Sequence, residues 1–301
     1  MRNISKKGAV VMIVVWSVIA ALLAALLVAL IVTGGFSGGG LFGEPKVIAT
    51  AEMDGGEFDS VEILWKSGKV SVTLSADGRM HLTQRSRYNV QPLDYGVEDG
   101  RLTLRENASW GIIFFGIGSR SSDLELQLPE KRYKEFLLSM SSGRSAVQGI
   151  SADDLRFKLT SGRLEGSGLE AGTLTAEMTS GNMAVSGAKA EALRVELTSG
   201  RAELSGSFPS IEGRATSGTA KISTDVLPTH LDGQVTSGKV SFTIPDNTGF
   251  TLYCTKSSGK LKSDFALMQS VSDKSHYAYG TDGPSYTGRL TSGTLEILRA
   301  G

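Results

Sequence analysis

The sequence predicts an all-β fold, a single-stranded β-solenoid (β-helix) with Thr-Ser-Gly rungs of about 19–21 residues, preceded by one N-terminal transmembrane helix. Three observations predict it. A Ser-Gly pair, usually after Thr or Ser, recurs at nearly constant spacing, apolar and polar residues alternate on both sides of each pair, and a long uncharged apolar run stands near the N-terminus.

The glycine of each pair marks a corner between two strands. Successive corner glycines are 18 to 21 residues apart, except for a final interval of 34. A regular period of this size is typical of stacked repeat architectures. The structural corners are Gly143, Gly162, Gly181, Gly200, Gly218, Gly238, Gly259 and Gly293.

The residues around each corner alternate in the strand period. Leu155, Phe157 and Leu159 precede one corner, with Arg156 and Lys158 between them. Alternation of this kind buries one face of a strand and leaves the other in water. Each repeat is therefore predicted to be a strand, a Thr-Ser-Gly corner and a second strand, and stacking makes the apolar core continuous.

The corner itself has a predicted mechanism. Glycine adopts positive φ without a Cβ clash, which allows a sharp turn. The Ser and Thr hydroxyls can satisfy backbone groups that a corner leaves unpaired. A further apolar position is expected to close the far end of each coil, at Ile150, Leu169, Ala188 and Phe208.

Residues 8–33 contain no charge and are long enough to span a bilayer. Arg2, Lys6 and Lys7 precede this run, so the positive-inside rule places residues 1–7 in the cytoplasm and the C-terminal domain outside the cell membrane, as a single-pass protein. A cleaved signal peptide is the alternative, but its apolar core is normally shorter, about 7–15 residues.

The rest of the chain divides by pattern. Residues 34–46 form a Gly-rich linker, which provides reach. Residues 47–135 are expected to be an irregular N-terminal β region of the solenoid, because terminal repeats must cover an exposed end. Residues 136–301 are expected to be the regular repeats with a C-terminal cap. An excursion around 267–284 is either a lateral loop or part of an end cap, and a final rung follows from Tyr286 to Ile297.

The Ser-Gly strand repeat, the strand that ends in a proline (Leu124 to Pro129) and the single N-terminal span resemble the bacterial β-strand-repeat family labelled "putative adhesin". The resemblance covers roughly residues 47 to 301. It implies an envelope protein in a family of largely unknown function, some members of which resemble accessory proteins of envelope-stress systems. It brings no catalytic residues with it.

The position after each corner glycine is rich in cations: Arg144, Arg163, Arg201, Lys239 and Lys260. Stacked at about 4.8 Å, these side chains would form a polyanion-binding column for a wall polymer or for lipid headgroups. The alternative is a solvated face on which neighbouring carboxylates pair with these cations, and such exposed pairs contribute little to stability.

The segment 110–118 is the most apolar stretch outside the anchor. One interpretation is a buried strand or cap. The other is an exposed apolar contact loop that touches the bilayer or a partner. The residues of this loop are Trp110, Ile112, Ile113, Phe114 and Phe115.

The sequence offers no catalytic, metal or cofactor signature. Its three histidines are scattered, and no nucleophile elbow, zinc spacing or phosphate-binding loop is present. The single cysteine, Cys254, occupies an inward position and is expected to be a buried apolar side chain. Equal numbers of acidic and basic residues, 31 each, give no global field that favours nucleic acid.

We therefore expect a membrane-anchored, extracytoplasmic β-solenoid that acts as a non-catalytic, adhesin-like surface binding module. One alternative is a regulatory accessory of a cell-envelope stress or sensor system, which would engage an envelope membrane protein. The other is a structural envelope scaffold. Reversing the charge of the basic column should abolish polymer binding, whereas a protein partner should depend more on the segment around Trp110.

Overall fold

The structure, a computed structural model, describes residues 44–107 and 121–301. Contacts divide the chain into two units, residues 1–46 with 87–89, and residues 47–86 with 90–301. The first is described only at 44–46 and 87–89, so the expected anchor at 8–33, most of the linker and the segment 110–118 lie outside the described residues. In the described ranges no helix is long and apolar enough to cross a membrane.

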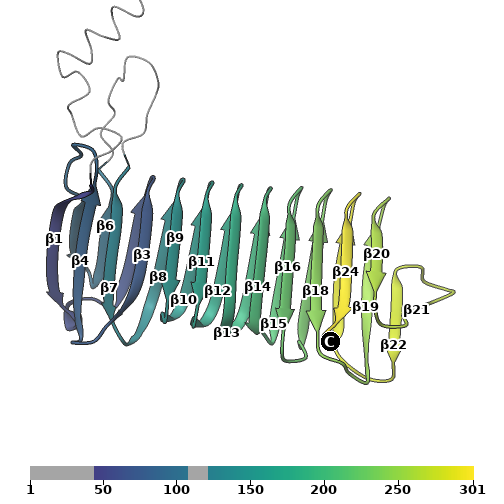
Figure 1. Cartoon of the computed structure of the whole chain (residues 1–301). Helices are drawn as coiled ribbons and strands as arrows, with labels where there is room; N and C mark the ends of the chain where they lie inside the picture. The colour runs from purple at the N-terminus through teal and green to yellow at the C-terminus, as the bar shows by residue number, and fades with distance from the viewer. Residues whose placement is uncertain (1–43, 108–120) are drawn as a thin grey trace, which may run out of the picture. The chain divides into compact units, whose positions relative to one another are not determined.

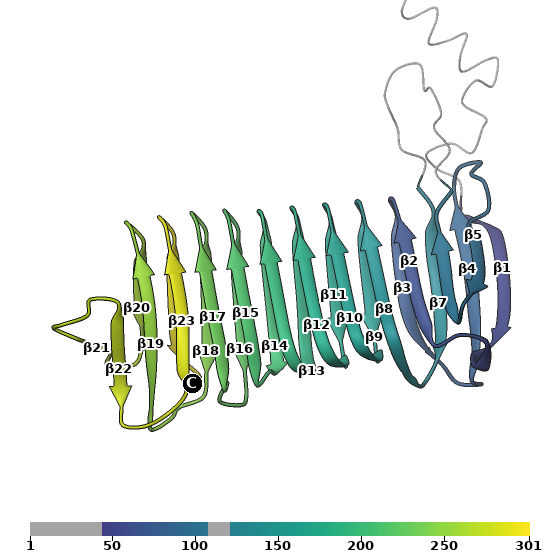
Figure 2. The same cartoon turned by 180° about the vertical axis from the view of Figure 1, so that it is seen from behind.

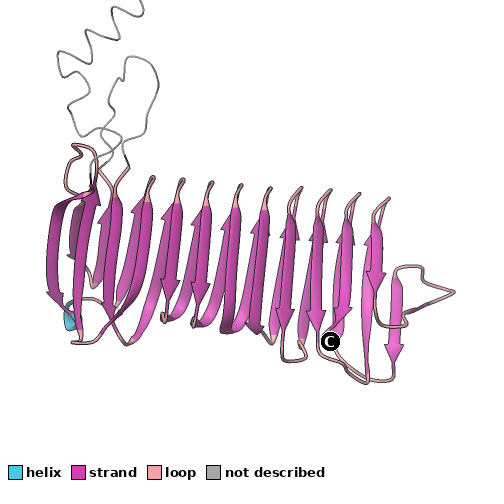
Figure 3. Ribbon diagram, in the orientation of Figure 1, coloured by secondary structure: helices cyan, strands magenta, loops and turns pink. Residues whose placement is uncertain are grey.

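The second unit is a row of stacked β-coils (Figure 1). Its strands belong to one hydrogen-bonded sheet of 24 strands, and the only described helix is the 3-10 turn η1 (Gly55–Glu57) (Figure 3). A regular coil contains one strand before the corner glycine and one after it. We call the strands before the corners wall A and those after the corners wall B. The all-β, solenoid-like prediction is confirmed.

Wall A is parallel along the stack, except at its two ends, where β5 pairs antiparallel with β6 and β22 pairs antiparallel with β19 and β21. In spatial order its strands are β5 (Asp94–Glu98), β6 (Arg101–Arg105), β2 (Ser60–Trp65), β8 (Arg132–Met140), β10 (Ser151–Leu159), β12 (Glu170–Met178), the second half of β13 (Asn182–Leu197), β15 (Ser210–Ala215), β17 (His230–Val235), β23 (Ser285–Leu290), β19 (Gly249–Lys256), β22 (His276–Gly280) and β21 (Met268–Gln269).

Wall B is also parallel, apart from β4, which pairs antiparallel with β7. The long strand β13 runs through both walls and joins them. In spatial order the strands of wall B are β1 (Lys46–Asp54), β4 (Arg79–Ser86), β7 (Asp123–Pro129), β3 (Lys69–Ser75), β9 (Arg144–Gln148), β11 (Arg163–Ser167), the first half of β13, β14 (Arg201–Ser207), β16 (Thr219–Thr224), β18 (Lys239–Ile244), β24 (Thr294–Arg299) and β20 (Lys260–Ser263).

The core lies between the two walls and follows the predicted alternation. Every second residue of β10 is buried from Leu155 to Leu159, and the same parity recurs along the stack. Cys254 is buried, as expected, and burial raises the pKa of its thiol to about 11. The predicted far-end residues are also buried: Ile150, Leu169, Ala188 and Phe208.

The corners are held mainly by backbone hydrogen bonds between neighbouring coils. The N–H of Arg163 donates to the carbonyl of Gly143 at 2.9 Å, and the N–H of Asn182 donates to Gly162 at 2.8 Å. The same bond recurs at the later corners. The hydroxyls contribute at fewer corners, such as Ser142, whose Oγ donates to the carbonyl of Lys66 at 3.2 Å. Backbone pairing, rather than a hydroxyl ladder, therefore satisfies most corner groups.

The explanation of the corner glycines by positive φ is correct for only half of them. Gly143, Gly162, Gly181 and Gly200 have φ between 86° and 108°. The later corner glycines are not in that region. There, a Cβ atom would collide with the neighbouring coil: at Gly238 it would lie 2.2 Å from a backbone oxygen of the preceding corner. Close approach of backbones is thus the second reason for glycine.

The first and last coils are inserted inside the stack. The coil of β2 and β3 lies between β6–β7 on one side and β8–β9 on the other. Likewise, β23 and β24 lie between β17–β18 and β19–β20 (Figures 1 and 2). The final rung in the sequence is therefore the second to last in space. Both terminal coils have hydrogen-bonded neighbours on each side, which protects them from fraying.

Carboxylates terminate the corner ladder at the N-terminal end, where the coil of β6 and β7 lacks a Ser-Gly corner. The buried Glu106 accepts hydrogen bonds from the N–H groups of Lys66 at 2.8 Å and Ser67 at 3.0 Å. Asp123 accepts from the N–H of Lys69 at 2.8 Å. Side-chain oxygens thus replace the backbone carbonyls that a preceding corner would supply.

The C-terminal end is covered by the excursion that the sequence left unassigned. Strand β22 pairs with β19, and this region closes over an aromatic cluster. Phe250 lies 5.3 Å from Phe265 and 5.1 Å from Tyr286, measured between ring centroids. The excursion is therefore part of an end cap.

Substitutions at the corners should separate the two reasons for glycine. Gly238→Ala should lower the free energy of unfolding by about 1–3 kcal/mol through close contact alone, and Gly181→Val should lower it further, because strain at positive φ is added. Gly96→Ala is the control, because a Cβ at Gly96 meets nothing within 4 Å. Chemical denaturation measures all three, and equal stability of the Gly238 and Gly96 variants would contradict the close-approach explanation.

Removing the Glu106 carboxylate should leave buried N–H donors without acceptors. We expect Glu106→Ala to lower the free energy of unfolding by about 2–4 kcal/mol. Glu191→Ala is the matched control, because Glu191 is exposed and has no ion pair or side-chain hydrogen bond in the described part of the chain. Denaturation curves that coincide for the two variants would show that Glu106 does not cap the ladder.

Candidate functional site

The predicted basic column exists as a straight row on wall B. The register places the residue after each corner glycine beside its equivalent in the next coil, for example Arg144 beside Arg163. We call these positions the basic row. In spatial order its members are Lys69, Arg144, Arg163, Asn182, Arg201, Thr219, Lys239, Thr294 and Lys260.

The structure adds one cation to the row and changes its order. Lys69 begins the row, and its position after Ser67-Gly68 is the sequence signal that could have found it. Thr294 lies between Lys239 and Lys260, because its coil is inserted there. The row therefore contains six cations and no carboxylate.

Most cations of the basic row are available to a ligand. In the described part of the chain, Lys69, Arg144, Arg201 and Lys260 form no ion pair, and all four are exposed. The Arg163 guanidinium lies 4.0 Å from Glu165, and both side chains are more than half exposed. Lys239 has the close partner Glu296, at 2.8 Å. The alternative of a fully paired face therefore holds only at part of the row.

The neighbouring row of wall B, two residues further along each strand, is mixed. Glu203 forms an ion pair with Lys221 at 3.1 Å and not with Arg201 of the basic row. Glu296 is almost buried and holds two lysines, Lys239 at 2.8 Å and Lys262 at 3.7 Å. This second row contains three carboxylates, Glu165, Glu203 and Glu296, and two lysines, Lys221 and Lys262. Two of its carboxylates also pair with cations of the basic row, Glu165 with Arg163 and Glu296 with Lys239.

A row of small hydroxyl side chains lies beyond the mixed row, and sequence reasoning missed it. It occupies the fifth position after five successive corner glycines, from Gly162 to Gly238, which is the signal that could have revealed it. The register places Ser167 beside Ser186, and Ser223 beside Ser205 and Thr243. Wall B thus presents cations, mixed charges and hydroxyls in parallel lines.

Wall A has the opposite electrostatic character, because its charges pair across coils. Such pairs neutralise its surface and occupy the groups that would contact a charged ligand. The pairs that connect different coils are Arg101–Glu135 at 2.7 Å, Arg132–Asp153 at 2.6 Å, Lys158–Glu177 at 3.4 Å, Lys189–Glu170 at 3.5 Å, Arg194–Glu212 at 3.1 Å and Arg214–Glu196 at 3.3 Å. Wall A also has exposed arginines without an ion pair in the described residues, Arg105 and Arg289, but the row in which they lie includes Glu177 and Glu196. The contrast is therefore that the basic row of wall B contains no carboxylate.

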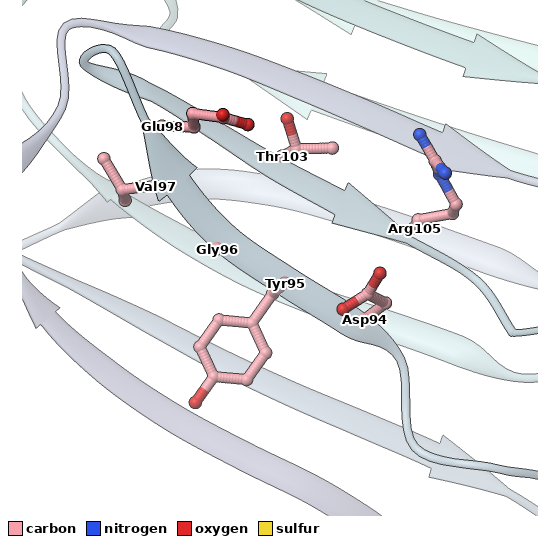
Figure 4. Close-up of a pocket in the computed structure, with 7 residues that line it drawn as sticks. All are labelled: Asp94, Tyr95, Gly96, Val97, Glu98, Thr103 and Arg105. Atoms are coloured by element: carbon pink, nitrogen blue, oxygen red, sulfur yellow. The ribbon is translucent and has the colours of Figure 1, made fainter.

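Several hollows lie on the surface of the described part of the chain. One of about 440 Å³ lies on β5 and β6 and is lined by Asp94, Tyr95, Glu98 and Arg105, among others (Figure 4). The side chains in it lie apart and do not converge on one point (Figure 4). In the residues that the structure describes, no group of three or more His, Cys, Asp or Glu side chains could hold a metal ion.

The other predicted site residues are the apolar contact loop and the corner glycines. The contact-loop residues Trp110, Ile112, Ile113, Phe114 and Phe115 lie outside the described residues. The eight corner glycines all stand between a wall A strand and a wall B strand. They position the basic row, because each of its members after Lys69 directly follows one of them.

Comparison with known proteins identifies one family and several solved structures with a similar fold. The sequence profile of the Toastrack DUF4097 family matches residues 58–290. No curated protein matches the chain.

Solved structures with a similar fold come from bacteria. A "putative adhesin" from Bacteroides fragilis NCTC 9343 has a TM-score of 0.52 at 14% identity, over 85% of this chain and 97% of that one. A "putative lipid binding protein" from Parabacteroides distasonis ATCC 8503 has a TM-score of 0.49 at 15% identity, with the same coverage. At 14% identity, the likeness to the Bacteroides fragilis structure shows the fold alone.

Glu296 should make the stability of the folded protein depend on pH. Burial raises the pKa of this carboxyl, but hydrogen bonds from Lys239 and Ser241 and the charges of Lys239 and Lys262 outweigh it, so the pKa lies below its ordinary value. A lowered pKa contributes stability above the unfolded value that is lost as pH falls through the folded value. Glu296→Gln should therefore be less stable than the natural protein at neutral pH.

The difference in free energy of unfolding between the Glu296→Gln variant and the natural protein should shrink as the pH falls below the ordinary carboxyl pKa of 4.5. Thermal unfolding of both proteins across this range measures the effect. A difference that stays constant with pH would contradict the assignment.

Proposed function

Because this chain belongs to the Toastrack DUF4097 family, we propose that it is a non-catalytic surface binding module of the bacterial envelope, which holds an anionic polymer on its basic row. The family match confirms the resemblance to adhesin-like β-strand-repeat proteins. The observation that carries the proposal is the contrast between the walls. Wall A pairs most of its cations with carboxylates of neighbouring coils, whereas the basic row of wall B contains no carboxylate and keeps four exposed cations without an ion pair in the described residues.

The arrangement suits charge-assisted hydrogen bonding to phosphate or carboxylate groups. An arginine guanidinium presents several N–H donors in one plane and binds such groups in a bidentate manner. Arg144, Arg163 and Arg201 supply this chemistry, and Lys239 and Lys260 add point charges. Because every strand of the row except β20 is hydrogen-bonded on both sides, the row is rigid, and a ligand meets cations that are already in place.

The position in the cell is proposed from sequence. The uncharged run 8–33 after Arg2, Lys6 and Lys7 supports a single-pass anchor with the solenoid outside the membrane. The Gly-rich linker, residues 34–46, would give the solenoid reach toward envelope polymers.

A regulatory accessory of an envelope-stress or sensor system is the second candidate. The observation that favours it is the apolar segment 110–118, which would contact a membrane partner. A structural envelope scaffold is the third candidate. These readings differ in which residues matter, and the following experiment separates them.

Reversing two unpaired cations of the basic row should abolish polymer binding. We expect the full chain with Arg144→Glu and Arg201→Glu, in a nonionic detergent, to lose at least tenfold affinity for purified anionic wall polymer at low salt. The matched control is Arg105→Glu with Arg289→Glu, which makes the same change in net charge on wall A, at arginines that form no ion pair in the described residues.

Equal loss in both double variants would indicate a general charge effect and would contradict the site. Retention of the chain only on membrane proteins, insensitive to salt and dependent on Trp110, would favour the regulatory accessory. Unchanged binding and phenotype in every variant would favour the scaffold.

A further inference from the structure

The basic row has a period that appears only in space. From Arg163 onward, cations and uncharged polar residues alternate coil by coil to the end of the row. The spatial sequence is Arg163, Asn182, Arg201, Thr219, Lys239, Thr294 and Lys260. Each cation is thus two coils from the next.

Chain order hides this alternation. Among the residues that directly follow a corner glycine, chain order gives Lys239, then Lys260, then Thr294. In that order two cations are consecutive, and the alternation is broken. The insertion of β24 between β18 and β20 places Thr294 between the two lysines. The coil insertion therefore completes the period.

The alternation sets a distance. Neighbouring strands of a sheet lie about 4.8 Å apart, so cations in alternate coils are spaced at about 10 Å. Parallel pairing keeps the register constant over these coils, which makes the row straight. A ligand with regularly spaced charges can contact several cations without bending.

We propose that the basic row binds a linear polyanion in register, with the polymer running along the stack and its anionic groups about 10 Å apart. This inference rests on the proposed function and specifies its ligand. The anionic groups lie over Arg163, Arg201, Lys239 and Lys260. The uncharged units between them lie over Asn182, Thr219 and Thr294, whose amide and hydroxyl groups can hydrogen-bond polyol or sugar oxygens.

A thread-like polymer fits this surface better than a bilayer. The row is one residue wide, so its cations form a single line that matches one extended chain rather than a planar anionic surface. Proteins that lie on membranes insert exposed aromatic or aliphatic side chains. Among the described residues, the large exposed apolar side chains are Val47, Tyr95, Leu227, Tyr253, Met268 and Val271, none of which belongs to the strands that carry the basic row.

The test exchanges two residues of the row without changing net charge. In the full chain, Asn182→Arg with Arg201→Asn breaks the alternation but keeps the net charge and the residue composition of the row. Gln234→Arg with Arg289→Gln on wall A is the matched control, because it also exchanges a cation with the uncharged residue beside it, outside the basic row. Thermal unfolding checks that both variants fold like the natural protein.

The probes are synthetic phosphodiester oligomers of equal charge with different spacers. A pentane-1,5-diol spacer places successive phosphates about 10 Å apart when extended, and a propane-1,3-diol spacer about 7 Å apart. We expect the natural protein to prefer the longer spacer by about tenfold or more. The Asn182/Arg201 exchange should remove this preference, and the Gln234/Arg289 exchange should keep it.

The outcomes distinguish failure of the 10 Å register from failure of the proposed polymer binding. If both oligomers bind equally and the exchange changes nothing, while Arg144→Glu with Arg201→Glu still abolishes binding, the register is overturned and the proposed function stands. If neither oligomer binds, but anionic lipid vesicles do, both the register and the polymer ligand are overturned.

Discussion

The structure depends on one repeated interaction, the hydrogen bond between a corner and the equivalent corner of the next coil. The N–H after each corner glycine donates to the glycine carbonyl of its spatial neighbour at 2.8 to 3.0 Å. Such a bond forms only if the two backbones approach closely. At Gly162, a Cβ atom would lie 2.4 Å from the Gly143 carbonyl oxygen. Glycine is therefore required by the contact between coils as much as by the turn itself.

This contact turns sequence positions into straight surface rows. Once the corners are in register, outward residues at the same distance from each glycine lie one strand apart. On wall A the resulting neighbours have opposite charge, as at Arg194 and Glu212, and the surface neutralises itself. On wall B, Arg144 and Arg163 lie side by side and are not neutralised in the same way. One scaffold thus produces a self-paired surface and a cationic one.

A stack of parallel coils must also end, and each end uses a different device. At the N-terminal end, Glu106 and Asp123 offer carboxylate oxygens to N–H groups that have no neighbouring corner. At the C-terminal end, β22 pairs antiparallel with β19 over the cluster around Phe250. Insertion of the first and last coils gives β2, β3, β23 and β24 hydrogen-bonded neighbours on both sides, so these strands are not open to pairing with other chains.

Local pattern alone determined the strands, the corners and the inward residues of the regular coils, because strand parity and glycine spacing are properties of neighbouring residues. The burial of Leu155, Phe157 and Leu159 follows from alternation. It also determined that cations follow the corners, as at Arg163 and Arg201.

Tertiary structure decided which coils are neighbours, and the local pattern contains no information on this. The insertion of the first coil placed Lys69 at the start of the row, and the insertion of the last placed Thr294 between Lys239 and Lys260. It also decided which cations are paired, since Glu296 reaches Lys239 and Lys262 from a different strand. The physical reason is that register and coil order are set by long-range backbone pairing, whereas parity is set within each strand.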